Sequence, residues 1–275
     1  MRIIGASGSV AVVKYTVFSL MFLLSCIGII VYGGRGDEIV PVYNTAETVP
    51  KEEALVETPN KETEEIKEKR PMEDVPEKLL MIDAGHGGED GGAISESGVY
   101  EKDLNLLVAD TTAHYCLMFG VPYKMTREDD RMLYDKYEDL SDYTGKKKAL
   151  DLKNRLKYAK ESGASLLLSV HMNKFTSENV TGLQVYYSPS ASDGESLASS
   201  IHSYVAAHIQ PDNDRAAKRA DSSIYLLNRA EMPALLVEYG FLSNPMECRM
   251  LCDTSYRASL SASVFIPVLE YFIRT

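Results

Sequence analysis

The stretch "ASLLLSVHMN", residues 164–173, is the clearest buried strand in this chain of 275 residues. It is short and apolar, as expected of a strand inside a sheet. Before it, residues 145–163 have the apolar spacing of an amphipathic helix that ends at Gly163. After it, "GLQVYYSP", residues 182–189, has the composition of a second strand. This order of helix and strand predicts an α/β fold.

The same alternation continues in both directions from residue 78 to the end of the chain. Strands are expected at 78–85, 121–127, 164–173, 182–189, 222–229 and 233–244, and helices at 101–120, 145–163, 195–209 and 255–274. Strands that alternate with helices form a mainly parallel sheet. We therefore expect a twisted, mainly parallel sheet flanked by helices on both faces. Ligands of such sheets bind beyond the carboxyl ends of the strands.

The N-terminal segment has a different composition. Residues 15–32, "YTVFSLMFLLSCIGIIVY", are apolar, uncharged and long enough to cross a bilayer as a helix. Arg2 and Lys14 precede them, which by the positive-inside rule leaves the N-terminus in the cytoplasm and the rest of the chain outside. A cleaved signal peptide and a lipoprotein acylated at Cys26 are the rival interpretations. We expect an uncleaved transmembrane anchor within residues 1–34.

Residues 35–77 are rich in Glu, Lys and Pro. Such a segment buries too little apolar surface to offset the entropy lost on ordering, so it is expected to be a disordered, acidic tether. The folded domain then comprises residues 78–275. The chain has 40 acidic and 29 basic residues, a formal charge of −11, which argues against nucleic acid as a partner.

Three side chains able to bind a metal follow or end predicted strands. His86 lies in a glycine-rich loop, "DAGHGGEDGGA", directly after the first strand. His171 lies near the end of "ASLLLSVHMN", and Glu238 ends the apolar run "ALLVE". Each has an ordinary structural explanation, such as a salt bridge or a hydrogen-bonded core imidazole. Their coincidence at one edge of one sheet favours a metal site.

Two imidazoles and one carboxylate that leave a position open are typical of catalytic zinc. A further carboxylate outside the coordination sphere would serve as general base. Besides Glu238, the acidic residues near His86 are candidates: Glu89, Asp90, Glu96 and Glu101. Glu101 begins a predicted helix, where glutamate is also favoured by the helix dipole. The spacing alone leaves the choice open.

Four motifs together resemble the zinc-dependent N-acetylmuramoyl-L-alanine amidases that cut bacterial cell wall. They are "DAGHGGEDGGA", "GVYEKDLNL", "SVHMN" and "LLVEYGFLSNPME", which occur in the family's order, and the resemblance covers residues 79–275. It implies that His86, Glu101 and His171 hold Zn²⁺ and that Glu238 is the catalytic carboxylate. It also implies that residues 78–275 are a catalytic domain facing the cell wall.

The resemblance implies hydrolysis of the amide between N-acetylmuramic acid and L-alanine in peptidoglycan. A zinc peptidase acting within the stem peptide, and a wall-binding domain without catalysis, are the alternatives. The run "GKKKALDLKNRL" and the single anchored domain also resemble sporulation amidases of Gram-positive spore formers. The sequence identifies no regulatory protein partner.

Two smaller expectations concern the surroundings of the site. The glycines between residues 85 and 92 are expected to let a glycan strand approach the metal without side-chain collisions. Many family members have Arg-x-x-x-Ala-Asn before the histidine strand, whereas this chain has Arg155, Ala159 and then Lys160. Because the departing position, Lys160, precedes the strand, it is expected to lie away from the chemistry.

Overall fold

The structure, a computed structural model, describes residues 78–134, 147–190 and 193–274. They belong to one compact unit that contains a six-stranded sheet of order β2-β1-β3-β6-β4-β5. The expected anchor and tether, residues 1–34 and 35–77, lie outside the described residues. None of the described helices is long and apolar enough to span a bilayer.

The sheet is mixed, with its parallel strands at the centre. The strands are β1 (Leu79–Ala84), β2 (Tyr123–Met125), β3 (Ala164–Asn173), β4 (Gln184–Tyr187), β5 (Lys218–Arg219) and β6 (Ala234–Phe241). β1 pairs in parallel with β2 and β3, and β3 with β6, whereas β4 runs antiparallel to β6. The expected α/β fold with a mainly parallel sheet is therefore confirmed, with one antiparallel pair.

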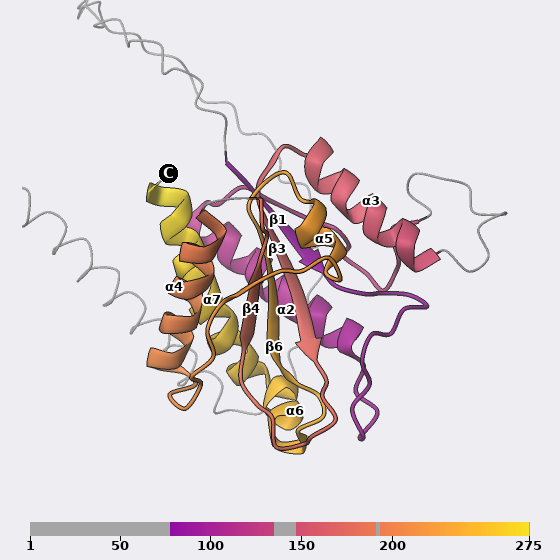
Figure 1. Cartoon of the computed structure of the whole chain (residues 1–275), viewed down its shortest axis with the longest axis vertical. Coiled ribbons are helices and arrows are strands. Elements are labelled where there is room, and N and C mark those ends of the chain that lie inside the picture. Colours follow the sequence, from indigo (N-terminus) through magenta and orange to yellow (C-terminus); the bar gives the residue numbers. More distant parts are fainter. Residues whose placement is uncertain (1–77, 135–146, 191–192, 275) are drawn as a thin grey trace, which may run out of the picture. The chain divides into compact units, whose positions relative to one another are not determined.

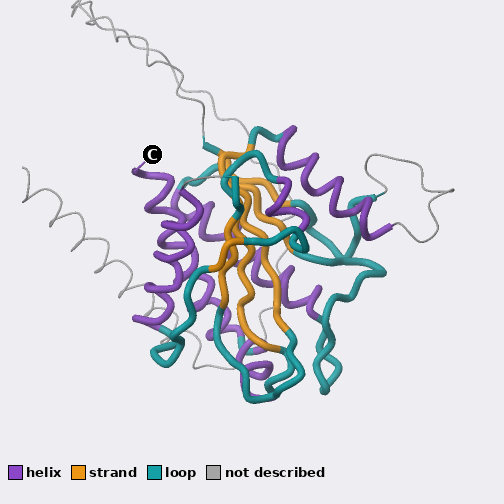
Figure 2. Tube along the Cα trace, in the orientation of Figure 1, coloured by secondary structure: helices purple, strands orange, loops and turns teal. Residues whose placement is uncertain are grey.

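Helices cover both faces of this sheet (Figures 1 and 2). They are α2 (Glu101–Phe119), α3 (Lys147–Glu161), α4 (Asp193–His208), α5 (Tyr225–Arg229), α6 (Pro245–Cys252) and α7 (Thr254–Arg274). A large core joins one face of the sheet to α2, α4 and α7, and a smaller one joins the other face to α3 and α5. Within β1, Leu80 and Ile82 enter the large core and Met81 the small one, as the alternation of a strand requires.

One expected strand is wrong. Residues 222–229 contain the short helix α5, and the edge strand β5 comes earlier, at Lys218–Arg219. Leu226 and Leu227 of α5 are buried in the smaller core. A short apolar run has the same composition in a buried strand and in a single buried helical turn, so its periodicity could not separate the two.

The polar residues of interest gather at the carboxyl edge of the parallel strands. β1 ends at Ala84, directly before the glycine-rich loop, and α2 begins at Glu101, directly after it. α2 ends at Phe119 and is capped by Gly120, whose φ of 67° is the left-handed conformation that glycine adopts without strain. β6 continues to Phe241, so Glu238 lies inside this strand. The sequence analysis had placed Glu238 at the end of the apolar run.

Candidate metal centre

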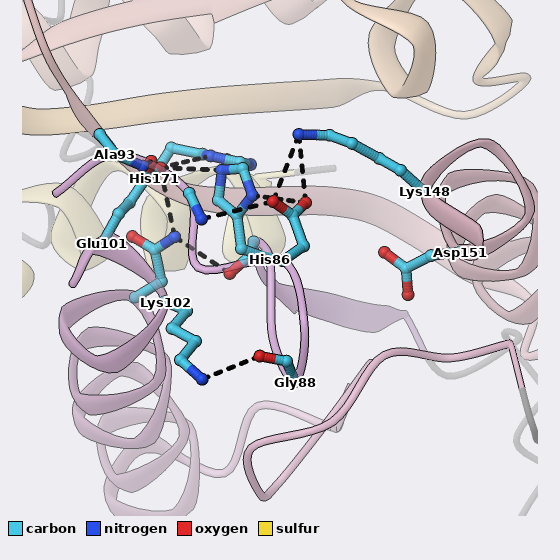
Figure 3. Close-up of polar contacts among 12 residues, drawn as sticks. His86, Gly88, Ala93, Glu101, Lys102, Lys148, Asp151 and His171 are labelled. Atoms are coloured by element: carbon cyan, nitrogen blue, oxygen red, sulfur yellow. Dashed lines mark hydrogen bonds and ion pairs between the residues drawn. The ribbon is translucent and has the colours of Figure 1, made fainter. Parts of the chain in front are cut away.

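His86, Glu101 and His171 come together at the carboxyl edge of the sheet (Figure 3). One ligand atom from each lies within 4.8 Å of the others, and this is the one such group found in the described part of the chain. His86 comes from the loop after β1, Glu101 from the first turn of α2 and His171 from β3. The structure therefore brings together the three residues that the resemblance implied as ligands.

The two imidazoles converge on one carboxylate oxygen. Glu101 Oε1 lies 3.2 Å from His86 Nε2 and 2.8 Å from His171 Nδ1. The same carboxylate accepts hydrogen bonds from the backbone N–H groups of Ala93, at 2.7 Å, and Met172, at 3.1 Å. Burial opposes its charge, but hydrogen bonds to both imidazoles outweigh this effect and hold the pKa of Glu101 far below its usual range. Glu101 is thus an ionised carboxylate at the centre of the group.

Asp90 fixes the orientation of His86 from the other side of the ring. Its Oδ2 lies 2.8 Å from His86 Nδ1 and 3.1 Å from Lys148 Nζ. Burial opposes a charged imidazole, but Asp90 and Glu101 together raise the pKa of His86 to about 9. An Nδ1–H donated to a carboxylate leaves Nε2 as the ligand atom, which is the usual outer-shell arrangement of a metal-binding histidine.

The glycines of the loop give room to the protein itself. A Cβ atom at Gly85 would lie 2.3 Å from atoms of the His171 ring. At Gly92, where φ is +66°, it would lie 2.5 Å from Glu101 Oε2 and 2.7 Å from His86 Cδ2. At these two positions the space that a side chain would need is already occupied by the candidate ligands. Their glycines let the loop close onto the three candidate ligands.

Glu238 lies beside this group without joining it. It is the register partner of His171 in the β3–β6 pair. Its pKa is influenced by the charges of Glu101 and both imidazoles. Its Oε2 is buried and has no hydrogen-bond partner among the described residues. Burial, the largest influence, raises the pKa of Glu238 to about 7. A carboxylate with a free oxygen and a pKa near neutrality can accept and release a proton.

Comparison with known proteins identifies the family. Residues 80–266 match the family model described as N-acetylmuramoyl-L-alanine amidase. The germination-specific N-acetylmuramoyl-L-alanine amidase of Bacillus subtilis is 35% identical over 195 residues, which cover 71% of this chain and 80% of that protein. The chain belongs to the N-acetylmuramoyl-L-alanine amidase family. Its activity is hydrolysis of the bond between N-acetylmuramic acid and L-alanine in peptidoglycan.

Solved structures agree with this assignment. The CwlD amidase from Clostridioides difficile, determined in complex with the GerS lipoprotein, superposes with a TM-score of 0.67 at 33% identity, covering 72% of this amidase and 100% of that chain. The catalytic domain of the CwlV amidase from Paenibacillus polymyxa superposes with a TM-score of 0.58 at 27% identity. The match covers 72% of this amidase and 99% of that domain. The α/β fold seen here is therefore the fold of the family.

The departure from the family motif lies away from the candidate ligands, as expected, because Lys160 is exposed and pairs with Glu231. The role of Arg155 in this amidase was not expected from the sequence. Its guanidinium is buried behind the metal loop and donates to the carbonyl of His86 at 2.6 Å. The signal was present in the family's Arg-x-x-x-Ala-Asn motif. A position before a strand in sequence can still reach the carboxyl edge, because the preceding helix packs across the sheet.

Proposed function

We propose that this amidase is zinc-dependent, with Zn²⁺ held by His86, Glu101 and His171 and with Glu238 as the proton carrier. The observation that carries the proposal is the convergence of two imidazole nitrogens on one ionised carboxylate oxygen. The ligand atoms of the three residues lie within 4.8 Å of one another, so a single cation can contact all three.

The donor set fits zinc. Two imidazole nitrogens and one carboxylate oxygen are typical of catalytic zinc sites, which keep a further position open. When bound, zinc polarises the scissile carbonyl and makes a water molecule more acidic. Asp90, which is itself paired with Lys148, orients His86. The backbone amides of Ala93 and Met172 orient Glu101.

Glu238 supplies the proton transfer. Its Oε2, which has no hydrogen-bond partner in the described part of the chain, can accept the proton of the attacking water and then deliver it to the departing L-alanine nitrogen. The products are a free lactyl carboxylate on muramic acid and a free amino group on L-alanine.

The bond that is cut separates the amidase from a zinc peptidase acting within the stem peptide. Purified peptidoglycan is digested with the full chain in detergent, with zinc and with a chelator, and the fragments are analysed by mass spectrometry. We expect zinc-dependent release of intact stem peptides that begin with a free L-alanine. Fragments in which L-alanine remains on muramic acid would identify the peptidase instead, and no release at any zinc concentration would indicate a domain without catalysis.

We further propose a role in the spore wall. It is supported by the germination-specific relative in Bacillus subtilis and by the likeness to CwlD, whose complex with a lipoprotein also suggests a protein partner for this chain. The same digestion, run on spore-cortex and vegetative peptidoglycan side by side, tests this role. Faster release of stem peptide from cortex than from vegetative peptidoglycan supports the role in the spore wall. Equal release from the two would contradict a preference for cortex.

We also propose that residues 15–32 remain on the mature protein as a transmembrane anchor, with the catalytic domain outside. The apolar, uncharged run and the basic residues Arg2 and Lys14 support this topology. The prediction is that the full-length chain sediments with membranes and that protease added outside the cell removes the domain. Recovery of a soluble form that begins after residue 33 as the main species would show a cleaved signal peptide.

A further inference from the structure

Two buried arginines lie directly behind the metal loop. Arg127 follows β2 and is 1% exposed, and Arg155 lies on α3 and is 2% exposed. A buried guanidinium is costly unless its N–H groups and its charge are matched. Asp83 and Asp151, both buried, supply two negative charges beside these two positive ones. This cluster of four residues, here called the arginine clamp, is therefore balanced in charge.

Arg155 holds the stretch of chain that carries His86. Its Nη1 donates to Asp83 Oδ1 at 2.8 Å and to the carbonyl of Ala84 at 2.7 Å. Its Nη2 donates to the carbonyl of His86 at 2.6 Å, and its Nε donates to Asp151 at 2.7 Å. One side chain thus fixes the end of β1 and the backbone of a candidate ligand.

Arg127 joins the same loop to the helix that carries Glu101. It donates to the carbonyls of Ala84, at 2.9 Å, and Gly85, at 3.1 Å. It also donates to the carbonyl of Lys102, next to Glu101, at 2.7 Å. The backbone before His86 and the first turn of α2 are therefore held by one guanidinium.

The loop needs such support because its conformation is unfavourable by itself. His86 has a φ of 62°, and it is the one non-glycine residue with a left-handed backbone in the described ranges. A non-glycine residue in this conformation is strained, and it persists where its surroundings impose it. The arginine clamp supplies that constraint through the carbonyls on both sides of the Gly85–His86 peptide.

We propose that Arg127 and Arg155 are positioning residues for zinc, which fix His86 and Glu101 in their binding arrangement before the metal arrives. This inference rests on the proposed zinc site. Neither guanidinium is a proposed zinc ligand. The two arginines therefore influence zinc affinity through the backbone that carries the ligands. Without the clamp, zinc must impose the loop conformation itself, and part of its binding free energy is lost.

Arg155→Lys is the sharpest test. Lysine keeps the positive charge between Asp83 and Asp151, but its single nitrogen cannot reach the acceptors that three guanidinium nitrogens reach now. The His86 carbonyl then loses its donor. We expect zinc affinity to fall by about 10–100-fold, the range seen when outer-shell partners of metal ligands are removed. Activity should return at high zinc, because the ligands and Glu238 are intact.

Arg257→Lys is the matched control. Arg257 is also buried, and it donates to the carbonyls of Leu251 and Cys252 where α6 meets α7. Its replacement removes the same kind of contact from a different part of the fold. The variant should unfold at a lower temperature, while its zinc affinity stays within about twofold of the unchanged chain.

The experiment measures zinc affinity of the full chain in detergent by competition with a chromophoric chelator, together with thermal unfolding of the metal-free form. Weaker zinc binding in Arg155→Lys, but not in Arg257→Lys, supports the clamp. Equal zinc affinity in Arg155→Lys and the unchanged chain would overturn it. Absence of stoichiometric zinc in the unchanged chain would instead refute the proposed metal site. Arg127→Lys, measured alongside, should weaken zinc binding in the same way even if Arg155→Lys does not fold.

Discussion

Replacing His86 or His171 with alanine should remove zinc and hydrolysis together. Each histidine supplies one of three proposed ligand atoms, all within 4.8 Å of one another. Loss of a ligand should exceed the 10–100-fold loss of affinity that is typical of outer-shell partners. We therefore expect less than stoichiometric zinc in both purified variants, and release of stem peptide from peptidoglycan at the level of a blank. Metal analysis and the digestion assay are run on the same preparations.

His114→Ala provides the matched control for these variants. His114 lies on α2 and is exposed, and its Nδ1 hydrogen-bonds to the carbonyl of Asp110, one turn earlier on the same helix, at 2.7 Å. The control should keep both zinc and activity. Stoichiometric zinc in both His86→Ala and His171→Ala would contradict the ligand assignment, even if activity were lost.

The candidate site could be predicted because its residues are tied to the clearest strands. β1, β3 and β6 are short apolar runs, and polar side chains near their carboxyl ends must face the same edge of a parallel sheet. That rule alone selected His86, His171 and Glu238. Glu101 needed the family resemblance, because only the folded loop shows that α2 begins beside both histidines.

The arginine clamp could not be predicted from the spacing of apolar residues. On α3 the buried positions include Asp151, Asn154 and Arg155, so the helix turns a polar side toward the interior. A charged residue on an amphipathic helix is normally assigned to solvent. Here the charges are buried because they meet Asp83 and the loop carbonyls, which are contacts distant in sequence. The same limit applies to α5, where tertiary packing rather than periodicity decided between helix and strand.

The two site carboxylates should respond differently to the same substitution. Glu238→Gln keeps the shape of the side chain and removes its basic oxygen. Glu238 lies outside the group of three ligand atoms, so zinc should be retained. Turnover should fall by roughly 10²-fold or more, the usual scale of general acid–base catalysis. Metal content and stem-peptide release, measured on one preparation, give both results.

Glu101→Gln should instead weaken zinc binding itself. A neutral amide is a poor zinc ligand, and both carboxylate oxygens already accept hydrogen bonds, from Ala93 and Met172. A glutamine would turn an N–H toward one of these donors and leave it unpaired, which also disturbs the loop. The substitution therefore removes both the negative charge of the ligand and one of the hydrogen bonds that orient it.

Glu247→Gln separates that second effect from metal binding. Glu247 is also buried, and it accepts from the backbone N–H groups of Gly182, at 2.8 Å, and Phe241, at 2.7 Å. Its replacement leaves a buried backbone N–H unpaired in the same way, so it should lower the unfolding temperature but leave zinc content unchanged. If Glu238→Gln loses zinc while Glu101→Gln keeps it, the roles of the two site carboxylates are reversed, and the metal is held from β6 rather than from α2.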